Sequence, residues 1–169
     1  MSVPLFRAAI LVFATLFVTP AVMAATPNPH PAAKPHAAAK SHPAPKQHRV
    51  VIQVDQNDPA VMNLALNNAT NILEFYRSKN EDVSIDIVTY GPGLHMLRAD
   101  TSPVKDRLAH MKDAAFPSTI RFSACSNTKE KMEKSEGHPV ELVKEASIVP
   151  AGVVHAMELE EKGWSYIRP

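Results

Sequence analysis

Short β-branched runs alternate with helix-patterned segments along residues 49–169, and this alternation constrains the fold more than any other feature. Strands are predicted at residues 49–54, 83–87, 119–124, 147–150 and 164–167. Apolar residues at helical spacing predict helices from Pro59 to about Lys79, after Ser102 and Pro103, and from Ala151 to about Lys162. Strands that alternate with helices form mostly parallel sheets covered on both faces. We therefore predict an α/β three-layer sandwich with a mostly parallel five-stranded sheet.

Residues 1–24 have the pattern of a secretory signal peptide. Arg7 precedes an apolar run at residues 8–18, and small residues at 21–25 surround an expected cleavage site after Ala24. The run is shorter than the ~20 apolar residues that a membrane-spanning helix needs. The sequence thus predicts export to the periplasm without a membrane span.

Residues 25–48 contain six prolines but no acidic or aromatic residue, so they cannot build a hydrophobic core. His30, His36, His42 and His48 recur every six residues, with lysines at the same step. We interpret this segment as a disordered His/Lys/Pro/Ala-rich spacer with weak affinity for metal or polyanions. The alternative is that two or more of its histidines fold around a copper, zinc or nickel ion. The remaining residues, 49–169, have the usual size of one folded domain.

Charge and missing motifs exclude several classes of function. The chain has a formal net charge of +1, and acidic residues outnumber basic ones once Arg7 and the three lysines of the spacer are set aside. A nucleic-acid partner is not expected, because no basic patch interleaved with aromatic residues is visible. The sequence also lacks the glycine-rich turns of dinucleotide and nucleoside-triphosphate enzymes and a paired-cysteine metal site.

Cys125 is the single cysteine of the chain. It follows the predicted strand at residues 119–124 and precedes a polar segment that we expect to form a helix lying loosely against the body, or covering a neighbouring subunit. A helix N-terminus stabilises a thiolate relative to a thiol, so the pKa of Cys125 should fall below that of a free cysteine. Cys125 is therefore a candidate nucleophile, although a lone cysteine is often a small buried core residue.

Ligands of open α/β sheets bind beyond the carboxyl ends of the strands. In this chain that edge gathers Asp55 and Asn57, the loop at residues 91–96, the segment from Cys125 to Asn127, and residues 150–152. His95 shares the predicted edge with Cys125, where an imidazole can polarise a thiol or protonate a leaving sulfur. An ordinary loop histidine is the alternative interpretation of His95, while His110, His138 and His155 are expected to be structural or solvated.

Five segments, in order along the chain, together resemble the DsrE/DsrF-like family. They are residues 54–59 (VDQNDP), 66–71 (LNNATN), 91–94 (GPGL), 124–128 (ACSNT) and 163–169 (GWSYIRP). The resemblance covers the whole predicted domain. It implies an α/β sandwich that assembles as a homo-trimer or homo-hexamer, and several members carry sulfur as a persulfide on a cysteine at the position of Cys125. It therefore implies a sulfur-handling role.

The favoured hypothesis is a sulfur carrier. The Cys125 thiolate takes sulfane sulfur from a donor and passes it to a thiol acceptor, whose identity the sequence does not reveal. Ser126, Asn127 and Lys129 are expected to support the thiolate through hydrogen-bond donors and positive charge. No metal or resident cofactor is assigned apart from the covalent sulfur itself, and without a second cysteine a carrier is favoured over a turnover enzyme.

Two competing functions stay open. In the first, the chain is a periplasmic copper- or other metal-binding module that uses Cys125, spacer histidines and three His/Met pairs. These pairs are His95 with Met96, His110 with Met111, and His155 with Met157. Helical spacing, however, predicts that Met111 and Met157 fill the core. In the second, the cysteine has no role and the domain serves assembly, for which Asn63, Asn67 and Asn71 form a stripe on one helix.

Overall fold

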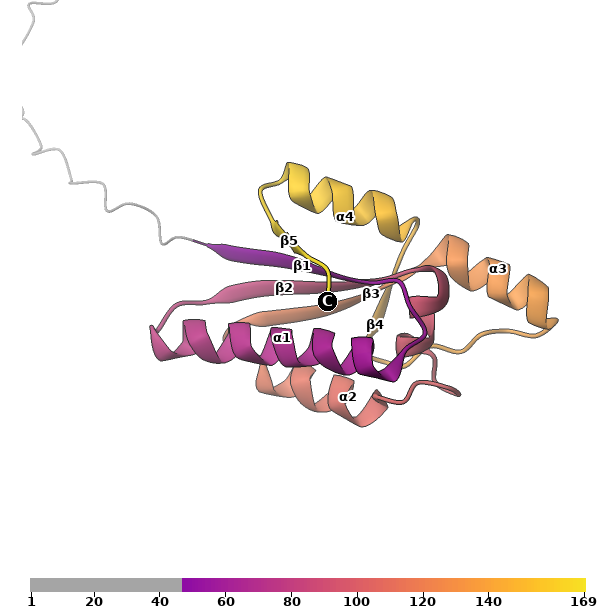
Figure 1. The fold of residues 1–169 in the computed structure, drawn as a ribbon, viewed down its shortest axis with the longest axis horizontal. Coiled ribbons are helices and arrows are strands. Elements are labelled where there is room, and N and C mark those ends of the chain that lie inside the picture. Colours follow the sequence, from indigo (N-terminus) through magenta and orange to yellow (C-terminus); the bar gives the residue numbers. More distant parts are fainter. Residues whose placement is uncertain (1–46) are drawn as a thin grey trace, which may run out of the picture. The chain divides into compact units, whose positions relative to one another are not determined.

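Five parallel strands form the centre of the molecule in a computed structural model that describes residues 47–169 (Figure 1). The strands are β1 (His48–Val54), β2 (Val83–Thr89), β3 (Thr119–Cys125), β4 (Ala146–Val149) and β5 (Ser165–Ile167). They lie in the order β4-β3-β2-β1-β5, and every pair is parallel. The predicted α/β sandwich with a five-stranded sheet is confirmed. The predicted signal peptide lies outside the described residues, as does the spacer up to residue 46.

His48 belongs to the folded domain, although the sequence interpretation placed it last in the spacer. It begins β1, its ring stacks on Tyr76 with centroids 3.9 Å apart, and its Nε2 lies 2.8 Å from Oε2 of Glu81. These contacts separate His48 from the repeat to which its spacing assigned it.

Helices cover both faces of the sheet, but unequally (Figure 1). The helices α1 (Pro59–Ser78) and α2 (Lys105–Ala114) lie on one face, and α4 (Gly152–Glu161) lies on the other. The main core between the sheet and the paired helices includes Ile52, Leu66, Ile85, Leu108 and Phe122. A smaller cluster of Val51, Val88, Ala156 and Leu159 lies under α4. No helix among the described residues is long and apolar enough to cross a membrane.

Asp58 and Ser102, each of which precedes a proline, have different roles at the starts of α1 and α2. Asp58 caps α1, since its carboxylate accepts the Ala60 N–H at 2.7 Å and Pro59 occupies the first turn. Ser102 instead donates to the Met96 carbonyl at 2.6 Å, and α2 begins only at Lys105. The same hydroxyl accepts the Val104 N–H at 3.3 Å, so Ser102 binds the backbone just before α2 without capping the helix.

The segment expected as a loop after β2 is the 3₁₀-helix η1 (Gly91–Leu97). It lies directly on the end of β1: a Cβ added at Gly93 would stand 2.1 Å from the Val54 carbonyl oxygen. Gly91 adopts a positive φ of 53°, which favours glycine. Both glycines therefore let η1 sit against the carboxyl ends of the strands.

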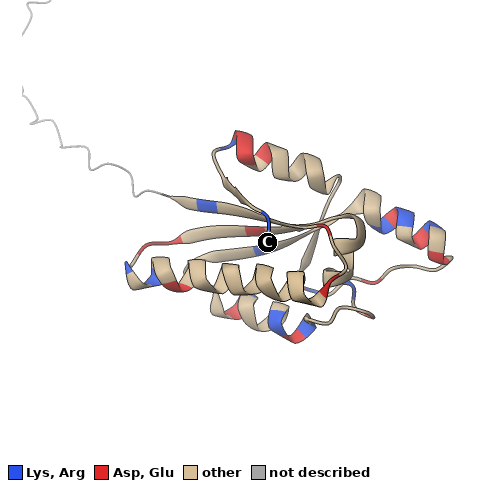
Figure 2. Ribbon diagram, in the orientation of Figure 1, with Lys and Arg blue, Asp and Glu red and all other residues tan. Residues whose placement is uncertain are grey.

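The polar helix α3 (Ser126–Glu136) extends away from the sheet (Figure 1). None of its residues is buried, and Met132 alone of its side chains packs against the edge of the core. Charged side chains of both signs occur along it (Figure 2). The expected loose placement of this helix is confirmed.

Candidate functional site

Cys125 lies where three elements meet. It is the last residue of β3 and the N-cap of α3, and a Cβ built at Gly152, the first residue of α4, would lie 3.2 Å from its Cβ. The side chain is 5% exposed. Helix N-termini carry unpaired N–H groups and partial positive charge, so two of them act on this one thiol.

The pKa of the Cys125 thiol lies below its ordinary value. Burial is the largest single influence and opposes ionisation. Hydrogen bonding from the Thr128 side chain and from the backbone N–H groups of Gly152, Thr128 and Asn127 outweighs it. The neutral thiol makes no capping bond to α3, so these donors act mainly on the thiolate, which is the stronger acceptor.

The positions of the α3 donors follow from helix geometry. With Cys125 as N-cap, Asn127 and Thr128 are the second and third residues of α3, whose N–H groups an N-cap side chain ordinarily reaches. The Asn127 N–H also donates to the Pro150 carbonyl at 3.3 Å, so this one N–H group serves both the carbonyl and Cys125. Cysteine thus takes the place of the usual Ser, Thr, Asp or Asn.

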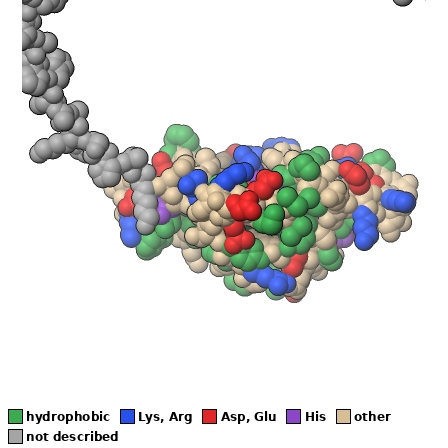
Figure 3. All heavy atoms as spheres, turned by 90° about the horizontal axis from the view of Figure 1, so that it is seen from above, with side chains coloured by type: hydrophobic (Ala, Val, Ile, Leu, Met, Phe, Trp, Pro, Cys, Tyr) green, Lys and Arg blue, Asp and Glu red, His purple; other side chains and the backbone are tan. Residues whose placement is uncertain are grey.

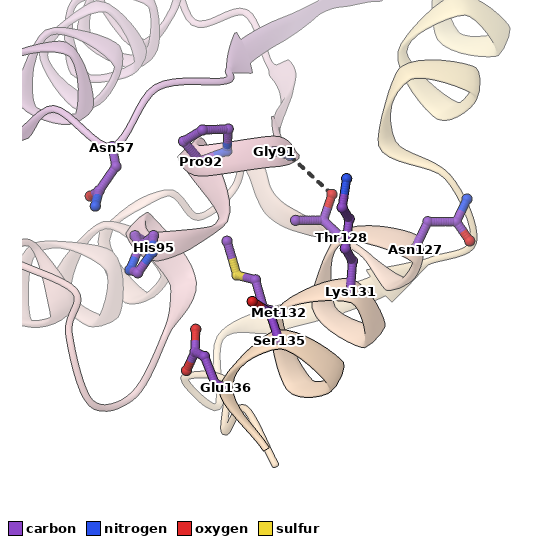
Figure 4. A pocket seen from close by; sticks show the side chains of 10 residues that line it. All are labelled: Asn57, Gly91, Pro92, His95, Asn127, Thr128, Lys131, Met132, Ser135 and Glu136. Carbon is purple, nitrogen blue, oxygen red and sulfur yellow. Dashed lines mark hydrogen bonds between the residues drawn. The ribbon is translucent and has the colours of Figure 1, made fainter. Parts of the chain in front are cut away.

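Thr128 is oriented toward the thiol by η1. The Gly91 N–H donates to the Thr128 hydroxyl oxygen at 3.0 Å (Figure 4). The Gly91 N–H therefore binds the same side chain that lowers the pKa of Cys125.

Tyr90 closes the site on the side of α4. A Cβ at Gly152 would lie 3.0 Å from both Cβ and Cδ1 of Tyr90, so the backbone of α4 packs directly on this ring. The pKa of Tyr90 is raised by burial and by the neighbouring charges of Asp55 and Tyr166, against a lowering by Arg168. The Tyr90 hydroxyl therefore stays protonated, and its ring forms one side of the site.

Two of the predicted supporting residues direct their side chains to other partners. The Ser126 hydroxyl donates to Oε1 of Glu130 at 2.9 Å, and Nζ of Lys129 lies 2.5 Å from Oε1 of Glu133. Neither side chain is among the largest influences on the pKa of Cys125. Asn127 does contribute, through its backbone.

His95, Asn57 and Asn127 line a pocket of about 560 Å³ beside the thiol. Nδ1 of His95 lies 3.0 Å from the Thr101 hydroxyl, and His95 is not among the largest influences on the pKa of Cys125. The pocket lies between η1 and α3 (Figure 4). Thr128 lines it too, so the pocket and the surroundings of Cys125 share Asn127 and Thr128.

Asp55 lies at the same edge but serves the C-terminal segment. Its Oδ2 accepts from Nε2 of Gln53 and from Nη2 of Arg168, each at 2.9 Å. The Tyr166 hydroxyl donates to Oε1 of Gln53. These bonds join the end of β1 to the last residues of the chain, beside Tyr90.

A buried polar network lies under α4 and was not expected from the sequence. Asp86 on β2 is 2% exposed and accepts from the Ser123 hydroxyl at 2.7 Å and from Nε2 of His155 at 3.0 Å. The expected structural role of His155 is borne out by this contact. It ties α4 to the sheet one turn beyond Gly152.

Within residues 47–169 no group of three or more His, Cys, Asp or Glu side chains is arranged to hold a metal ion. Met96 and Met111 are buried, but Met157 is 51% exposed, so the prediction that it fills the core is wrong. The residue lies on the outer side of a helix that covers the sheet alone. The spacer histidines lie outside the described residues, apart from His48.

The sequence interpretation gave no role to Thr128 or to Gly152, although it placed residues 150–152 at the same edge as Cys125. Thr128 could have been found, because the third residue of a helix commonly reaches back to the N-cap. Gly152 comes from a distant segment and has no side chain. Its role appears only when β3 and α4 are placed together.

One solved structure is similar to this protein in sequence and in fold. The protein MTH1491 of unknown function from Methanobacterium thermoautotrophicum is 30% identical and superposes with a TM-score of 0.59. The match covers 72% of this chain and 99% of that one. This chain belongs to the same family as MTH1491. No protein-family model matches the chain, and no curated protein matches it.

Proposed function

We propose that this protein is an exported sulfur carrier of the DsrE/DsrF-like type, which accepts sulfane sulfur on Cys125 and passes it to a thiol partner. The observation that carries the proposal is the convergence of two helix N-termini and the Thr128 hydroxyl on one thiol whose pKa is lowered. A structural core cysteine would have no use for such donors, since burial alone raises a thiol pKa. The five segments that resemble the family supply the class of reaction.

The chemistry needs the thiolate and a donor with sulfur in a persulfide or polysulfide. The Cys125 sulfur attacks the terminal sulfane sulfur of R–S–SH, a new S–S bond forms on Cys125, and R–S⁻ leaves. Cys125–S⁻ and R–S–SH become Cys125–S–SH and R–S⁻. No external oxidant or reductant enters, because the sulfane sulfur keeps its oxidation state as it moves between thiols.

The same donors suit the product. A cysteine persulfide is more acidic than its thiol, so Thr128 and the N–H groups of α3 and α4 would hold it as an anion. With a single cysteine in the chain, no internal disulfide can discharge that sulfur. The acceptor must bring its own thiol, which makes the protein a carrier.

The proposal includes assembly as a homo-trimer or homo-hexamer in the periplasm. The assembly state follows from the family resemblance, and the compartment follows from the signal-peptide pattern of residues 1–24. Support for assembly comes from Val153, Val154 and Met157 of α4 and from Ile148 of β4, which are 43–60% exposed. Hydrophobic side chains gather on the face that α4 covers (Figure 3). Light scattering coupled to size-exclusion chromatography, on wild type and Val153→Glu, tests this part.

Intact mass spectrometry tests the central step. The purified protein is incubated with inorganic polysulfide, beside Cys125→Ser and with dithiothreitol reversal. We expect additions of whole sulfur atoms to the wild type alone, removed by the reductant. A matched alkylation with iodoacetamide, in native and in denatured protein, reports access to the thiol. Absence of sulfur addition, with alkylation only after denaturation, would identify Cys125 as a core residue and reject the proposal.

A further inference from the structure

The pocket between η1 and α3 is larger than the proposed chemistry alone requires. It measures about 560 Å³, in the range that holds small organic molecules. An inorganic polysulfide of a few atoms would leave most of it empty. Its size points to a donor or acceptor whose sulfur is attached to an organic body.

The lining has the mixed character of a small-molecule site. Pro92 and Met132 supply apolar surface from opposite walls, and Met132 extends from α3 toward Pro92 and His95 (Figure 4). Asn57, Asn127 and Ser135 supply groups that donate and accept hydrogen bonds. Such a lining fits a ligand with amide groups on a short carbon chain.

The charges of the pocket favour an anion. Lys131 lines it and makes no ion pair or side-chain hydrogen bond with any other residue between 47 and 169. The other charged lining residue, Glu136, is already held by the Arg98 guanidinium at 2.6 and 2.9 Å. An ammonium without a partner beside a neutralised carboxylate is suited to a ligand carboxylate.

The position of the pocket connects it with the thiol. Asn127 and Thr128 belong both to the lining and to the groups that stabilise the Cys125 thiolate. A molecule in the pocket therefore contacts the first turn of α3, whose groups act on Cys125, while Cys125 itself is 5% exposed and does not line the pocket.

We propose that this pocket binds a low-molecular-weight thiol compound that carries a carboxylate and amide groups, with its carboxylate on Lys131 and its sulfur end at the first turn of α3. This inference rests on the proposed function for the transfer step, but the binding itself does not. In the transfer, the bound hydropersulfide R–S–SH gives its terminal sulfur to Cys125 and leaves as R–S⁻, in the balanced exchange described above. The pocket thereby selects the organic part R.

The test uses S-methylglutathione, a peptide thioether that has the carboxylates and amides but cannot exchange sulfur. Binding to the purified protein is measured by isothermal titration calorimetry and by amide chemical shifts in ¹⁵N-labelled protein. We expect shifts in the first turns of η1 and α3. Lys131→Glu should raise Kd by about tenfold, the loss expected for one charge-assisted contact. Lys134→Glu makes the same charge change on the same helix outside the pocket lining and should leave Kd within about twofold.

Esterifying the carboxylates of the probe should weaken binding to the wild type and remove the difference between it and Lys131→Glu. No binding at millimolar probe, shifts confined to other surfaces, or equal losses in Lys131→Glu and Lys134→Glu would overturn the proposal. Failure here remains distinct from failure of the carrier function. Sulfur addition from inorganic polysulfide without probe binding would reject only the pocket, and probe binding without sulfur addition would reject only the carrier.

Discussion

Nε2 of His155 lies 3.0 Å from Oδ2 of Asp86, and this contact joins α4 to the sheet under the helix turn that begins with Gly152. Asp86 is 2% exposed, and its side chain accepts hydrogen bonds from His155 and from the Ser123 hydroxyl. The Gly152 N–H in turn stabilises the Cys125 thiolate. His155 is therefore a positioning residue for the candidate site, which it does not touch.

We predict that His155→Leu destabilises the protein by about 2 kcal/mol, because it leaves a buried carboxylate short of a partner. It should also raise the pKa of Cys125, since α4 is no longer held against the sulfur. The pH dependence of iodoacetamide alkylation measures this pKa. Asp86→Asn in the His155→Leu background should restore part of the stability, because a neutral amide costs less to bury without that partner than a carboxylate does. His110→Leu, on the exposed side of α2, is the control. An unchanged alkylation profile in His155→Leu would show that the network is structural only.

Thr128→Val should raise the pKa of Cys125 toward that of a free thiol. The change removes the one side-chain donor to the thiolate and keeps the shape of the side chain. We expect a shift of about one unit, the size of a single hydrogen bond to a charged group. The rise of thiolate absorbance at 240 nm with pH measures it.

Thr128→Ser is the matched control, because it keeps the hydroxyl that accepts from Gly91. Its titration should follow that of the wild type. Equal pKa values in Thr128→Val and Thr128→Ser would mean that the backbone donors alone set the acidity of the thiol.

The lowered pKa of Cys125 predicts a pH-dependent contribution to stability. A group whose pKa is lower in the folded state stabilises that state fully above its unfolded pKa, about 8.5 for a thiol, and loses this contribution as pH falls through the folded pKa. The free energy of unfolding of the wild type, relative to Cys125→Ser, should therefore be greater at pH 9 than at pH 6. Urea unfolding of the two proteins at each pH, under reducing conditions, measures this difference in free energy. A difference that shrinks toward pH 9 would contradict the lowered pKa.

The elements of this fold could be predicted from the sequence because their signals are local. The β-branched run of residues 49–54, Asp58 before Pro59, and the position of Cys125 between strand and helix each show in a few neighbouring residues. The partners of the thiol were harder to predict. Ser126 and Lys129 were named because they follow Cys125, yet their side chains bind Glu130 and Glu133.

Other features of the site and fold could not be predicted, because they depend on packing between segments that are distant in the sequence. Gly152 acts through its backbone, and Met157 has helical spacing but faces outward, because α4 covers its side of the sheet alone. The same holds for Asp86, which reads as an ordinary polar residue in a strand until His155 is placed above it. Sequence periodicity cannot show which of two helix faces finds a partner.

Arg98 fixes the far end of the pocket. Its guanidinium is 3% exposed and forms paired hydrogen bonds with Asp100 and Glu136, which join the end of η1 to the end of α3. The bonds to Arg98 hold the pKa of the Asp100 carboxyl group well below its ordinary range and lower the pKa of Glu136. We predict that Arg98→Ala is less stable than the wild type at pH 7. The difference between their free energies of unfolding should become smaller below about pH 4. The sign follows because carboxyl groups with lowered pKa lose their stabilising contribution as pH falls.

Chemical denaturation of Arg98→Ala and wild type at pH 7 and pH 3.5 measures this difference. Arg98→Lys is the informative control, because one ammonium cannot make the two-pronged bonds to both carboxylates. The free energy of unfolding of Arg98→Lys at pH 7 should lie between those of Arg98→Ala and the wild type. If Arg98→Ala is less stable than the wild type by the same amount at both pH values, Arg98 acts through packing and not through its charge.

Gly152→Ala tests the convergence of α4 on the thiol most directly. The added Cβ would meet Tyr90 at 3.0 Å and the Cβ of Cys125 at 3.2 Å, so α4 must shift or Tyr90 must turn. We expect a loss of about 1–2 kcal/mol, typical of overpacking, together with a higher pKa of Cys125 and slower sulfur uptake. Glu160→Ala, at an exposed position of the same helix, should change neither quantity. Unchanged alkylation kinetics in a destabilised Gly152→Ala protein would mean that α3 and Thr128 suffice to activate the thiol without α4.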